Sequence, residues 1–123
     1  MINANVIVLY VDNPSASSAF YADLFDRQPV ESSPNFAMFA LDSGLMLGLW
    51  AKSAVQPLPV ASGGAVELVI SVDDRDAVSA THSDWAARGL AIAQRPTDMD
   101  FGYTFVALDR DGHRLRVMAP RPE

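Results

Sequence analysis

The stretch that decides the fold is Val11–Phe25, with the sequence VDNPSASSAFYADLF, because parts of it return 61 residues further along the chain. Val11-Asp12 recurs as Val72-Asp73, and further pairs match at the same spacing: Ala16 and Ala77, Ser18 and Ser79, Ala19 and Ala80, Asp23 and Asp84, and Arg27 and Arg88. Self-similarity at one spacing indicates a duplicated unit. Chance matches among common Ala, Ser and Asp residues are the competing explanation, but the elements predicted for the two halves also match.

Each half is predicted to begin with a strand followed by a helix. Residues 5–11 and 66–72 are apolar and β-branched, as strands are. The first helix begins at Asn13-Pro14 and the second at Asp74, both N-cap signals. Three shorter strands complete each half, near 29–31, 36–41 and 45–50 in the first and near 91–94, 103–108 and 114–118 in the second. The sequence therefore predicts an α+β fold of two βαβββ modules, with an insertion near 96–102.

We expect one domain over residues 1–123, because the chain is too short for two independent cores. Within it, module 1 covers 1–52 and module 2 covers 65–120. Residues 53–64 (SAVQPLPVASGG) are rich in Pro, Gly, Ser and Ala, and they form the predicted linker.

The composition excludes several classes of protein. Of the residues, 50% are hydrophobic and 20% charged, which argues for a packed core and against disorder. The chain has no cysteine, so disulfides, Fe–S clusters and thiolate metal sites are excluded. With a net charge of −6 and no long apolar run, we expect no nucleic-acid partner and no membrane span. Residues 1–5 lack the basic start of a signal peptide, so we expect a cytoplasmic protein.

The last two strands of each module form a hairpin, so alternation assigns side chains to faces. In module 1, a turn at 42–45 places Phe39 opposite Gly48. One face then carries Ala37, Phe39, Met46, Gly48 and Trp50, and a glycine beside large aromatics suits an open, concave surface. The corresponding face of module 2 is more polar and carries Thr104, Val106, Leu108, Arg114, Arg116 and Met118. Plain solvent exposure is the alternative for this second face.

The repeated unit, the stretch Val11–Phe25 and the segment 109–117 (DRDGHRLRV) together resemble the vicinal oxygen chelate superfamily. That superfamily includes glyoxalase I, extradiol dioxygenases, fosfomycin-resistance enzymes and bleomycin-resistance proteins. The resemblance covers residues 5–120. It implies a fold in which the curved sheets of two modules close around a cavity, usually in a homodimer.

The resemblance also implies where a metal would lie, on the first and last strands of each module. Carried onto this chain, the four ligand positions are Asn5, Gly48, Glu67 and Arg116. Divalent ions need neutral nitrogen or anionic oxygen donors, whereas glycine has no side-chain donor and a guanidinium repels a cation. We therefore expect no metal and no other cofactor.

Catalytic groups of other kinds are also few. The sequence has no cysteine nucleophile, no Gly-x-Ser-x-Gly motif and no Gly-rich phosphate loop. Glu67 beside Arg116 is either a catalytic carboxylate or, more simply, half of a structural ion pair. His82 is expected on a helix surface and His113 in a hairpin turn, and the segment 109–112 lacks the closing glutamate of a calcium loop. No catalytic residue is predicted.

Without metal ligands, the closer relatives are the members that, as the resemblance implies, bind bleomycin-like, mitomycin-like or phenazine-like drugs without altering them. The predicted ligand-binding residues are Asn5, Phe39, Met46, Gly48, Trp50, Glu67, Asp100, Phe101, Tyr103 and Arg116, with the last aromatic pair in a loop over 97–103. Asp100 and Glu67 suit a cationic ligand and Arg116 suits an acid, so the sign of the ligand stays open. Packing between modules or at the dimer contact is the competing role for Trp50, and anchoring to a partner subunit is the competing role for Phe101 and Tyr103.

Three functions follow from these observations. The first is a metal-independent protein that sequesters a planar aromatic compound, such as an antibiotic, in the cavity of a homodimer. The second is a lyase, isomerase or dioxygenase of the same superfamily with an atypical metal site. The third is an interaction scaffold that binds no small ligand.

Overall fold

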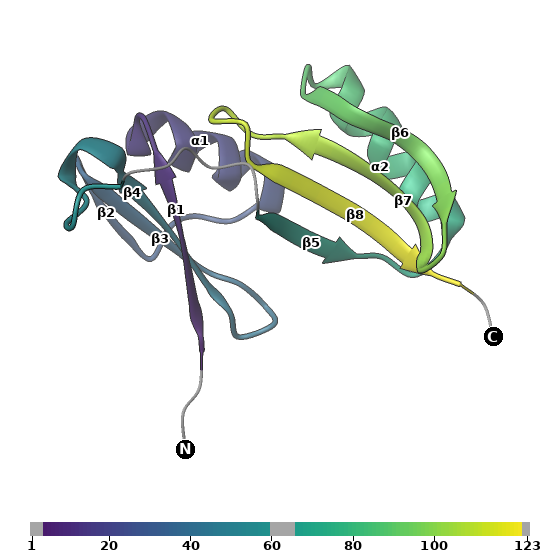
Figure 1. Ribbon diagram of the computed structural model, residues 1–123, viewed down its shortest axis with the longest axis horizontal. Helices are drawn as coiled ribbons and strands as arrows, with labels where there is room; N and C mark the ends of the chain where they lie inside the picture. The colour runs from purple at the N-terminus through teal and green to yellow at the C-terminus, as the bar shows by residue number, and fades with distance from the viewer. Residues whose placement is uncertain (1–3, 60–65, 122–123) are drawn as a thin grey trace. The chain divides into compact units, whose positions relative to one another are not determined.

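The computed structural model describes residues 4–59 and 66–121 and divides the chain into two compact units, 1–62 and 63–123 (Figure 1). Unit 1 contains β1 (Val6–Val11), α1 (Pro14–Phe25), β2 (Glu31–Ser33), β3 (Phe36–Ala40), β4 (Met46–Ala51) and the short helix η1 (Lys52–Ala54). Unit 2 contains β5 (Glu67–Ser71), α2 (Arg75–Ala87), β6 (Ala91–Met99), β7 (Gly102–Leu108) and β8 (Arg114–Pro120). Both units run strand, helix and three strands, which confirms the predicted α+β fold of two βαβββ modules.

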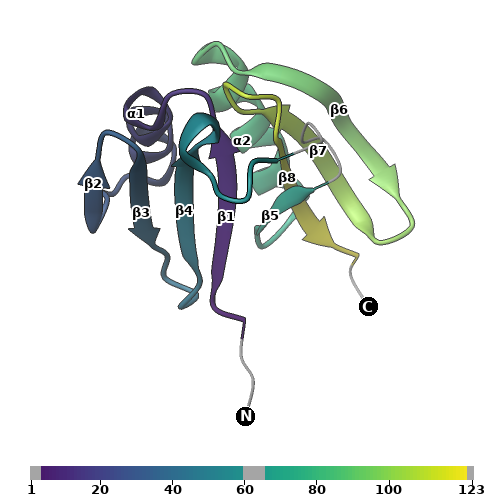
Figure 2. The same ribbon diagram turned by 60° about the vertical axis from the view of Figure 1, so that its left-hand side comes forward.

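The two sheets share one topology. Their strand orders are β1-β4-β3-β2 and β5-β8-β7-β6, and the side-by-side arrangement of β2, β3, β4 and β1 can be followed in Figure 2. In each sheet the first strand pairs parallel with the last, and the other neighbours are antiparallel. Equal strand order in both units supports the duplication seen in the sequence.

The two helices begin at the predicted caps. The side chain of Asn13 accepts a hydrogen bond from the Ala16 amide (3.2 Å), and that of Asp74 accepts one from the Ala77 amide (2.8 Å). The buried residues of α1 are Pro14, Ser17, Ser18 and Tyr21, and those of α2 are Val78 and Trp85. No helix in the described ranges is long and apolar enough to cross a membrane.

The β3–β4 hairpin of unit 1 differs from the prediction by one residue. Phe39 pairs with Leu47, and Met38 rather than Phe39 lies opposite Gly48. The cause is a shorter turn, in which the Leu41 amide donates to the Leu45 carbonyl (2.9 Å) and Gly44 adopts φ +93°. The predicted open position of Phe39 is therefore wrong, because its 0% exposed side chain lies with Leu47 and Leu49 in the core.

The β7–β8 hairpin of unit 2 has the predicted register. Thr104, Val106 and Leu108 pair with Met118, Arg116 and Arg114. Its turn is held by Asp109, whose Oδ1 accepts from the amides of Asp111 (2.9 Å) and His113 (2.8 Å). The other face of this sheet packs on α2, where Phe105 meets the rings of His82 and Trp85.

Strand β6 is longer than predicted. It runs from Ala91 to Met99 and shifts register twice, between Ile92 and Gln94 and between Gln94 and Thr97. The predicted loop over 97–103 is thus mostly strand, with Asp100 and Phe101 left in the turn. Such shifts are β-bulges, which place extra residues in one strand and bend it. Strand β6 can therefore hold the residues that the second module has in excess over the first.

Close backbone packing at the start of β7 gives a stability prediction. Gly102 has φ +150°, and an added Cβ would lie 2.2 Å from the carbonyl oxygen of Ala119, whereas a Cβ at Gly44 would meet no atom within 4 Å. Gly102→Ala should lower the free energy of unfolding by about 2–5 kcal/mol through strain and overlap. Gly44→Ala, which adds left-handed strain alone, should lower it by about 1–2 kcal/mol. Urea denaturation of both variants tests this, and equal losses would contradict it.

Candidate ligand-binding site

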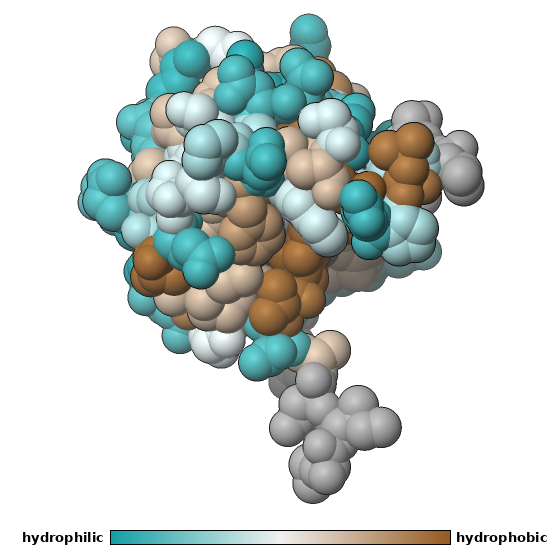
Figure 3. Space-filling view, turned by 90° about the vertical axis from the view of Figure 1, so that its left-hand side faces the viewer, coloured by the Kyte–Doolittle hydropathy of each residue, from teal (hydrophilic) through white to brown (hydrophobic). Residues whose placement is uncertain are grey.

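One face of the unit 1 sheet is not covered by its helix. Helix α1 packs on β3 and β4 over the buried side chains Phe39, Leu47 and Leu49. The opposite side chains form what we call the open apolar face: Val6, Val8, Tyr10, Phe36, Met38, Met46, Gly48 and Trp50. Val6, Val8 and Tyr10 are 41%, 37% and 39% exposed. Figure 3 looks toward unit 1 and shows brown apolar surface among teal polar side chains.

Aromatic rings gather at one end of the open apolar face. The Tyr10 and Trp50 rings meet edge to face, with centroids 6.4 Å apart, and Phe36 pairs with Trp50 across the hairpin. The side chains of Phe36 and Val8 fill the predicted open space above Gly48. A Cβ added at Gly48 would lie 3.1 Å from Phe36 Cζ and 3.3 Å from Val8 Cγ2. A ligand on this face therefore meets the rings of Phe36, Tyr10 and Trp50 and not the backbone of Gly48.

The matching face of unit 2 is charged. Arg116 donates from Nε to Glu67 Oε1 (2.8 Å) and from Nη2 to Glu67 Oε2 (2.9 Å). Its Nη1 donates to Gln94 Oε1 (3.1 Å) and Thr104 Oγ1 (3.2 Å). We call these four residues the Arg116 network. Arg114 approaches the same carboxylate, with Nη1 3.7 Å from Glu67 Oε2.

The Arg116 guanidinium holds the pKa of the Glu67 carboxyl below its ordinary value. The hydrogen bond from Arg116 is the largest cause, partial burial opposes it, and the charges of Arg116 and Arg114 lower the pKa further. A carboxylate held in this way is ionised at neutral pH and bonded through both oxygens. The geometry is that of a structural ion pair, the simpler of the two predicted roles for Glu67.

The turn between β6 and β7 brings one predicted aromatic residue to the Arg116 network. The Phe101 ring is 45% exposed and its centroid lies 5.7 Å from the guanidinium carbon of Arg116. Tyr103 lies on the other side of the strand from Thr104, where Arg75 at the start of α2 stacks on its ring at 3.9 Å. Arg75 also pairs with Asp98. The structure thus groups Phe101 with Arg116 and Glu67 and leaves Tyr103 on the helix side, while Asp100 is exposed in the turn.

The structure changes one of the four predicted metal positions. Val8 pairs with Gly48 as Val69 pairs with Arg116, so Gly48 and Arg116 are equivalent. By the same register Val6, and not Asn5, is the equivalent of Glu67; Asn5 precedes β1 and its carbonyl accepts from the Met46 amide (2.9 Å). The four side chains are then a valine, a glycine, an arginine and a carboxylate bonded to that arginine. This donor set does not fit a divalent metal.

A second group of ligand-type atoms lies at the β7–β8 turn. Within residues 4–59 and 66–121, Asp109, Asp111 and His113 bring such atoms within 4.8 Å of one another. Asp109 is already engaged, because Oδ1 holds two backbone amides and Oδ2 lies 2.8 Å from His113 Nδ1. The arrangement is explained as the closure of a hairpin turn.

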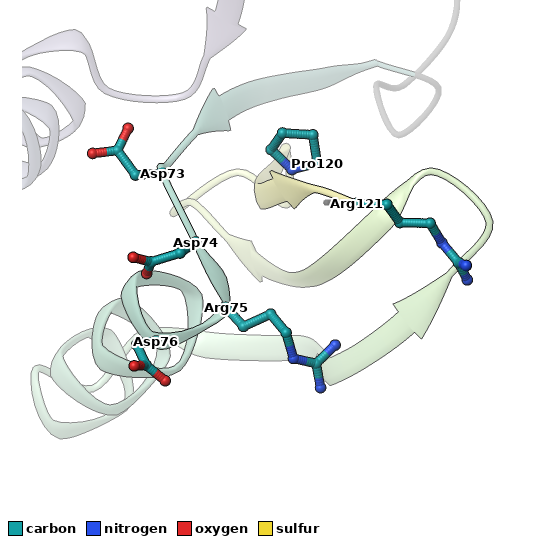
Figure 4. A pocket seen from close by; sticks show the side chains of 6 residues that line it. All are labelled: Asp73, Asp74, Arg75, Asp76, Pro120 and Arg121. Carbon is teal, nitrogen blue, oxygen red and sulfur yellow. The ribbon is translucent and has the colours of Figure 1, made fainter. Parts of the chain in front are cut away.

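An open depression lies at the start of α2, lined by Asp73, Asp74, Arg75, Asp76, Pro120 and Arg121 (Figure 4). Its arginines point away from its carboxylates. Arg75 is engaged with Asp98 and Tyr103, and Arg121 donates to the Met99 carbonyl (3.2 and 3.3 Å). Asp74 caps the helix, Arg75 joins α2 to β6 and β7, and Arg121 joins the end of β8 to the end of β6.

The sequence did not single out Tyr10, Phe36 or Gln94 for the site. Val6, Val8 and Tyr10 alternate along β1 on the side opposite the buried Leu9 and Val11, but all six residues of the strand are apolar, so the sequence pattern does not indicate which side is open. Gln94 sits between two register shifts of β6, and no periodic pattern gives the direction of a side chain there.

Two repeated βαβββ modules, each with a helix on one side of a mixed sheet, define the glyoxalase class of fold. The chain belongs to the Glyoxalase/Bleomycin resistance protein/Dioxygenase superfamily, whose family model matches residues 3–117. It is 26% identical over 121 residues to the phenazine antibiotic resistance protein EhpR of Enterobacter agglomerans, across 94% of this chain and 91% of that protein. These findings confirm the predicted family.

Solved structures agree. The solution NMR structure of protein ATC0852 from Agrobacterium tumefaciens is 46% identical, with a TM-score of 0.91 over 99% of this chain and 100% of that one. A glyoxalase-related enzyme from Fulvimarina pelagi, at 22% identity, superposes with a TM-score of 0.83 over 97% of this chain and 88% of that one. The second likeness shows the fold alone.

The Glu67–Arg116 pair gives a pH prediction. A carboxyl whose pKa is depressed by folding adds stability above its ordinary pKa, and this stability is lost as the pH falls through the depressed value. Glu67→Gln should therefore cost about 1–2 kcal/mol of unfolding free energy at neutral pH, and the difference from the parent should close in acid. Urea denaturation across the acid range measures it. Glu31→Gln, an exposed change on β2, is the control, and a Glu67→Gln gap that stays constant with pH would contradict the assignment.

Proposed function

We propose that this chain is a metal-independent binding protein for a planar aromatic small molecule of the antibiotic kind. The observation that carries the proposal is the open apolar face, where the rings of Tyr10, Phe36 and Trp50 lie on a sheet surface that α1 does not cover. Partly exposed aromatic clusters of this kind mark binding surfaces in soluble proteins. The name of the relative EhpR, a phenazine antibiotic resistance protein, supports a flat, ring-containing ligand.

The ligand contacts proposed in each unit follow from the geometry. In unit 1 they are Tyr10, Phe36, Met46 and Trp50; in unit 2 they are Phe101, Glu67 and Arg116, with Asp100 beside them in the turn. A good ring contact adds about 0.5–1.5 kcal/mol beyond the area it buries. Phe39, Tyr103 and Gly48 leave the proposed set, because Phe39 is buried, Tyr103 is turned to the helix side and Gly48 is covered. Asn5 also leaves it, because it precedes β1 and Val6 takes its place in the register.

Metal independence rests on the donor set. The positions equivalent to the family's metal ligands hold Val6, Gly48, Glu67 and Arg116, and both oxygens of the one carboxylate already accept hydrogen bonds from the guanidinium. The chain has no cysteine to serve as a ligand or nucleophile. These features favour sequestration of the ligand over its conversion. A lyase, isomerase or dioxygenase with an atypical site and a scaffold without a small ligand are the alternatives that the experiments below separate.

A two-fold homodimer in the cytoplasm completes the proposal. Strand β1 lies at the edge of its sheet and exposes Val6, Ile7, Val8 and Tyr10 by 36–41%. An exposed apolar edge strand is unfavourable in water unless another chain or element covers it. We expect a dimer in sedimentation velocity at micromolar concentration, and a strict monomer would count against this part of the proposal.

Fluorescence of Trp50 tests the ligand. The chain has two tryptophans, and Trp85 is 6% exposed against Phe105, so Trp85→Phe leaves Trp50 as the reporter. Titration of this variant with phenazines and other planar aromatics should quench the emission and saturate. Calorimetry of Trp50→Ala should show a loss of affinity of about five- to tenfold, for the lost ring contact.

The same titrations separate the alternatives. Binding that is unchanged by EDTA supports metal independence, whereas a stoichiometric metal in protein purified without chelator, or binding that EDTA abolishes, supports the enzyme alternative. No quenching and no heat across a broad panel of planar compounds would leave the scaffold alternative.

A further inference from the structure

We infer that the ligand carries an anionic group, most simply a carboxylate, which Arg114 and the Arg116 network recognise on the charged face of unit 2. This inference rests on the proposed function and assigns a sign to the ligand charge, which the sequence leaves open.

The side chains of β5 and β8 on this face carry one positive charge in excess. The charged residues are Glu67 on β5 and Arg114 and Arg116 on β8, which share one side of the sheet. Both oxygens of Glu67 accept hydrogen bonds from Arg116, at 2.8 and 2.9 Å, so this carboxylate is matched by one guanidinium. Arg114 lies further away, at 3.7 Å, and its side chain is 50% exposed. Arg114 is therefore placed to meet an anion from solvent.

The hydrogen bonds of the Arg116 network hold Arg116 and Glu67 in place beside the proposed anion site. Thr104 is 0% exposed and its hydroxyl both accepts from Arg116 Nη1 (3.2 Å) and donates to the Val117 carbonyl (2.8 Å). Gln94 holds the same Nη1 from β6. With its side chain 14% exposed and four of its donor contacts committed, Arg116 cannot swing away to release Glu67. A cationic ligand thus finds no uncommitted carboxylate in this network.

An aromatic surface adjoins the excess charge. The exposed Phe101 ring lies 5.7 Å from the Arg116 guanidinium carbon, so a ring stacked on Phe101 would bring its substituents toward the arginines. Carboxylates pair with guanidinium groups through short, charge-assisted hydrogen bonds. An aromatic acid satisfies both features at once.

Nearby acidic residues do not neutralise Arg114 in the way that Glu67 neutralises Arg116. Asp98 pairs with Arg75, on the Tyr103 side of β7. Asp100 is exposed in the turn, where solvent and salt screen its charge. The whole chain carries −6 and repels anions at long range, so the preference for an anion depends on the local charge of Arg114.

Isothermal titration calorimetry with phenazine carboxylate and phenazine carboxamide tests the inference, since the two probes differ mainly in charge. The parent should bind the carboxylate about three- to tenfold more tightly than the amide, and this preference should weaken as sodium chloride is added. Arg114→Gln should remove most of the preference, because it should weaken binding of the carboxylate more than binding of the amide. Arg88→Gln, the same change of charge near the end of α2, is the matched control and should keep the preference.

Each outcome of these titrations tests one part of the proposal: the anionic group, the role of Arg114 or aromatic binding itself. Equal binding of acid and amide, or a preference that survives Arg114→Gln, would overturn the anionic group while leaving aromatic binding intact. A preference lost equally in Arg88→Gln would reduce it to an effect of net charge and would also overturn the role of Arg114. Failure of both probes, together with a silent Trp50 titration, would instead contradict the proposed function itself.

Discussion

The parallel pairing of the first strand of each unit with its last strand is the constraint on which the rest of the structure depends. A parallel neighbour cannot be reached by a tight turn, so the intervening chain must cross over, and α1 and α2 make that crossing on one face of their sheets. The opposite face is left for other contacts. The same pairing brings Glu67 beside Arg116, 49 residues apart in the chain. The strand pairing that determines the fold therefore also brings together the ion pair of the candidate site.

The sequence predicts the parts of this architecture that follow from local pattern. The repeat, both N-caps and the β7–β8 register can be derived from it, because capping residues and regular alternation act over a few positions. The position of Phe39 shows the limit of prediction from such local patterns. Whether the β3–β4 turn holds three residues or four depends on whether Gly44 takes a left-handed conformation, and both choices leave apolar residues on both faces. Composition alone does not distinguish them.

The candidate site was harder to predict than the fold for a related reason. Glu67 and Arg116 lie on regular strands, and alternation places them on one face correctly. Tyr103 is the second residue of β7 and follows a bulged strand and its turn, and its pairing with Arg75 of α2 comes from tertiary contact. Gln94 reaches Arg116 only because β6 bends twice. The two modules also show how far copies of one backbone diverge, since equivalent positions hold Val6 and Gly48 in one and a bidentate ion pair in the other.

The three-residue turn of β3–β4 has a consequence for how such proteins diversify. Inserting or deleting one residue between Leu41 and Leu45 would exchange the inner and outer faces of β3 relative to β4. Phe39 would then be presented outward and Phe36 inward, with no substitution on either strand. The length of this turn thus decides which of a fixed set of side chains face the helix and which face outward, and a comparison of aligned strand residues alone would not reveal such a change.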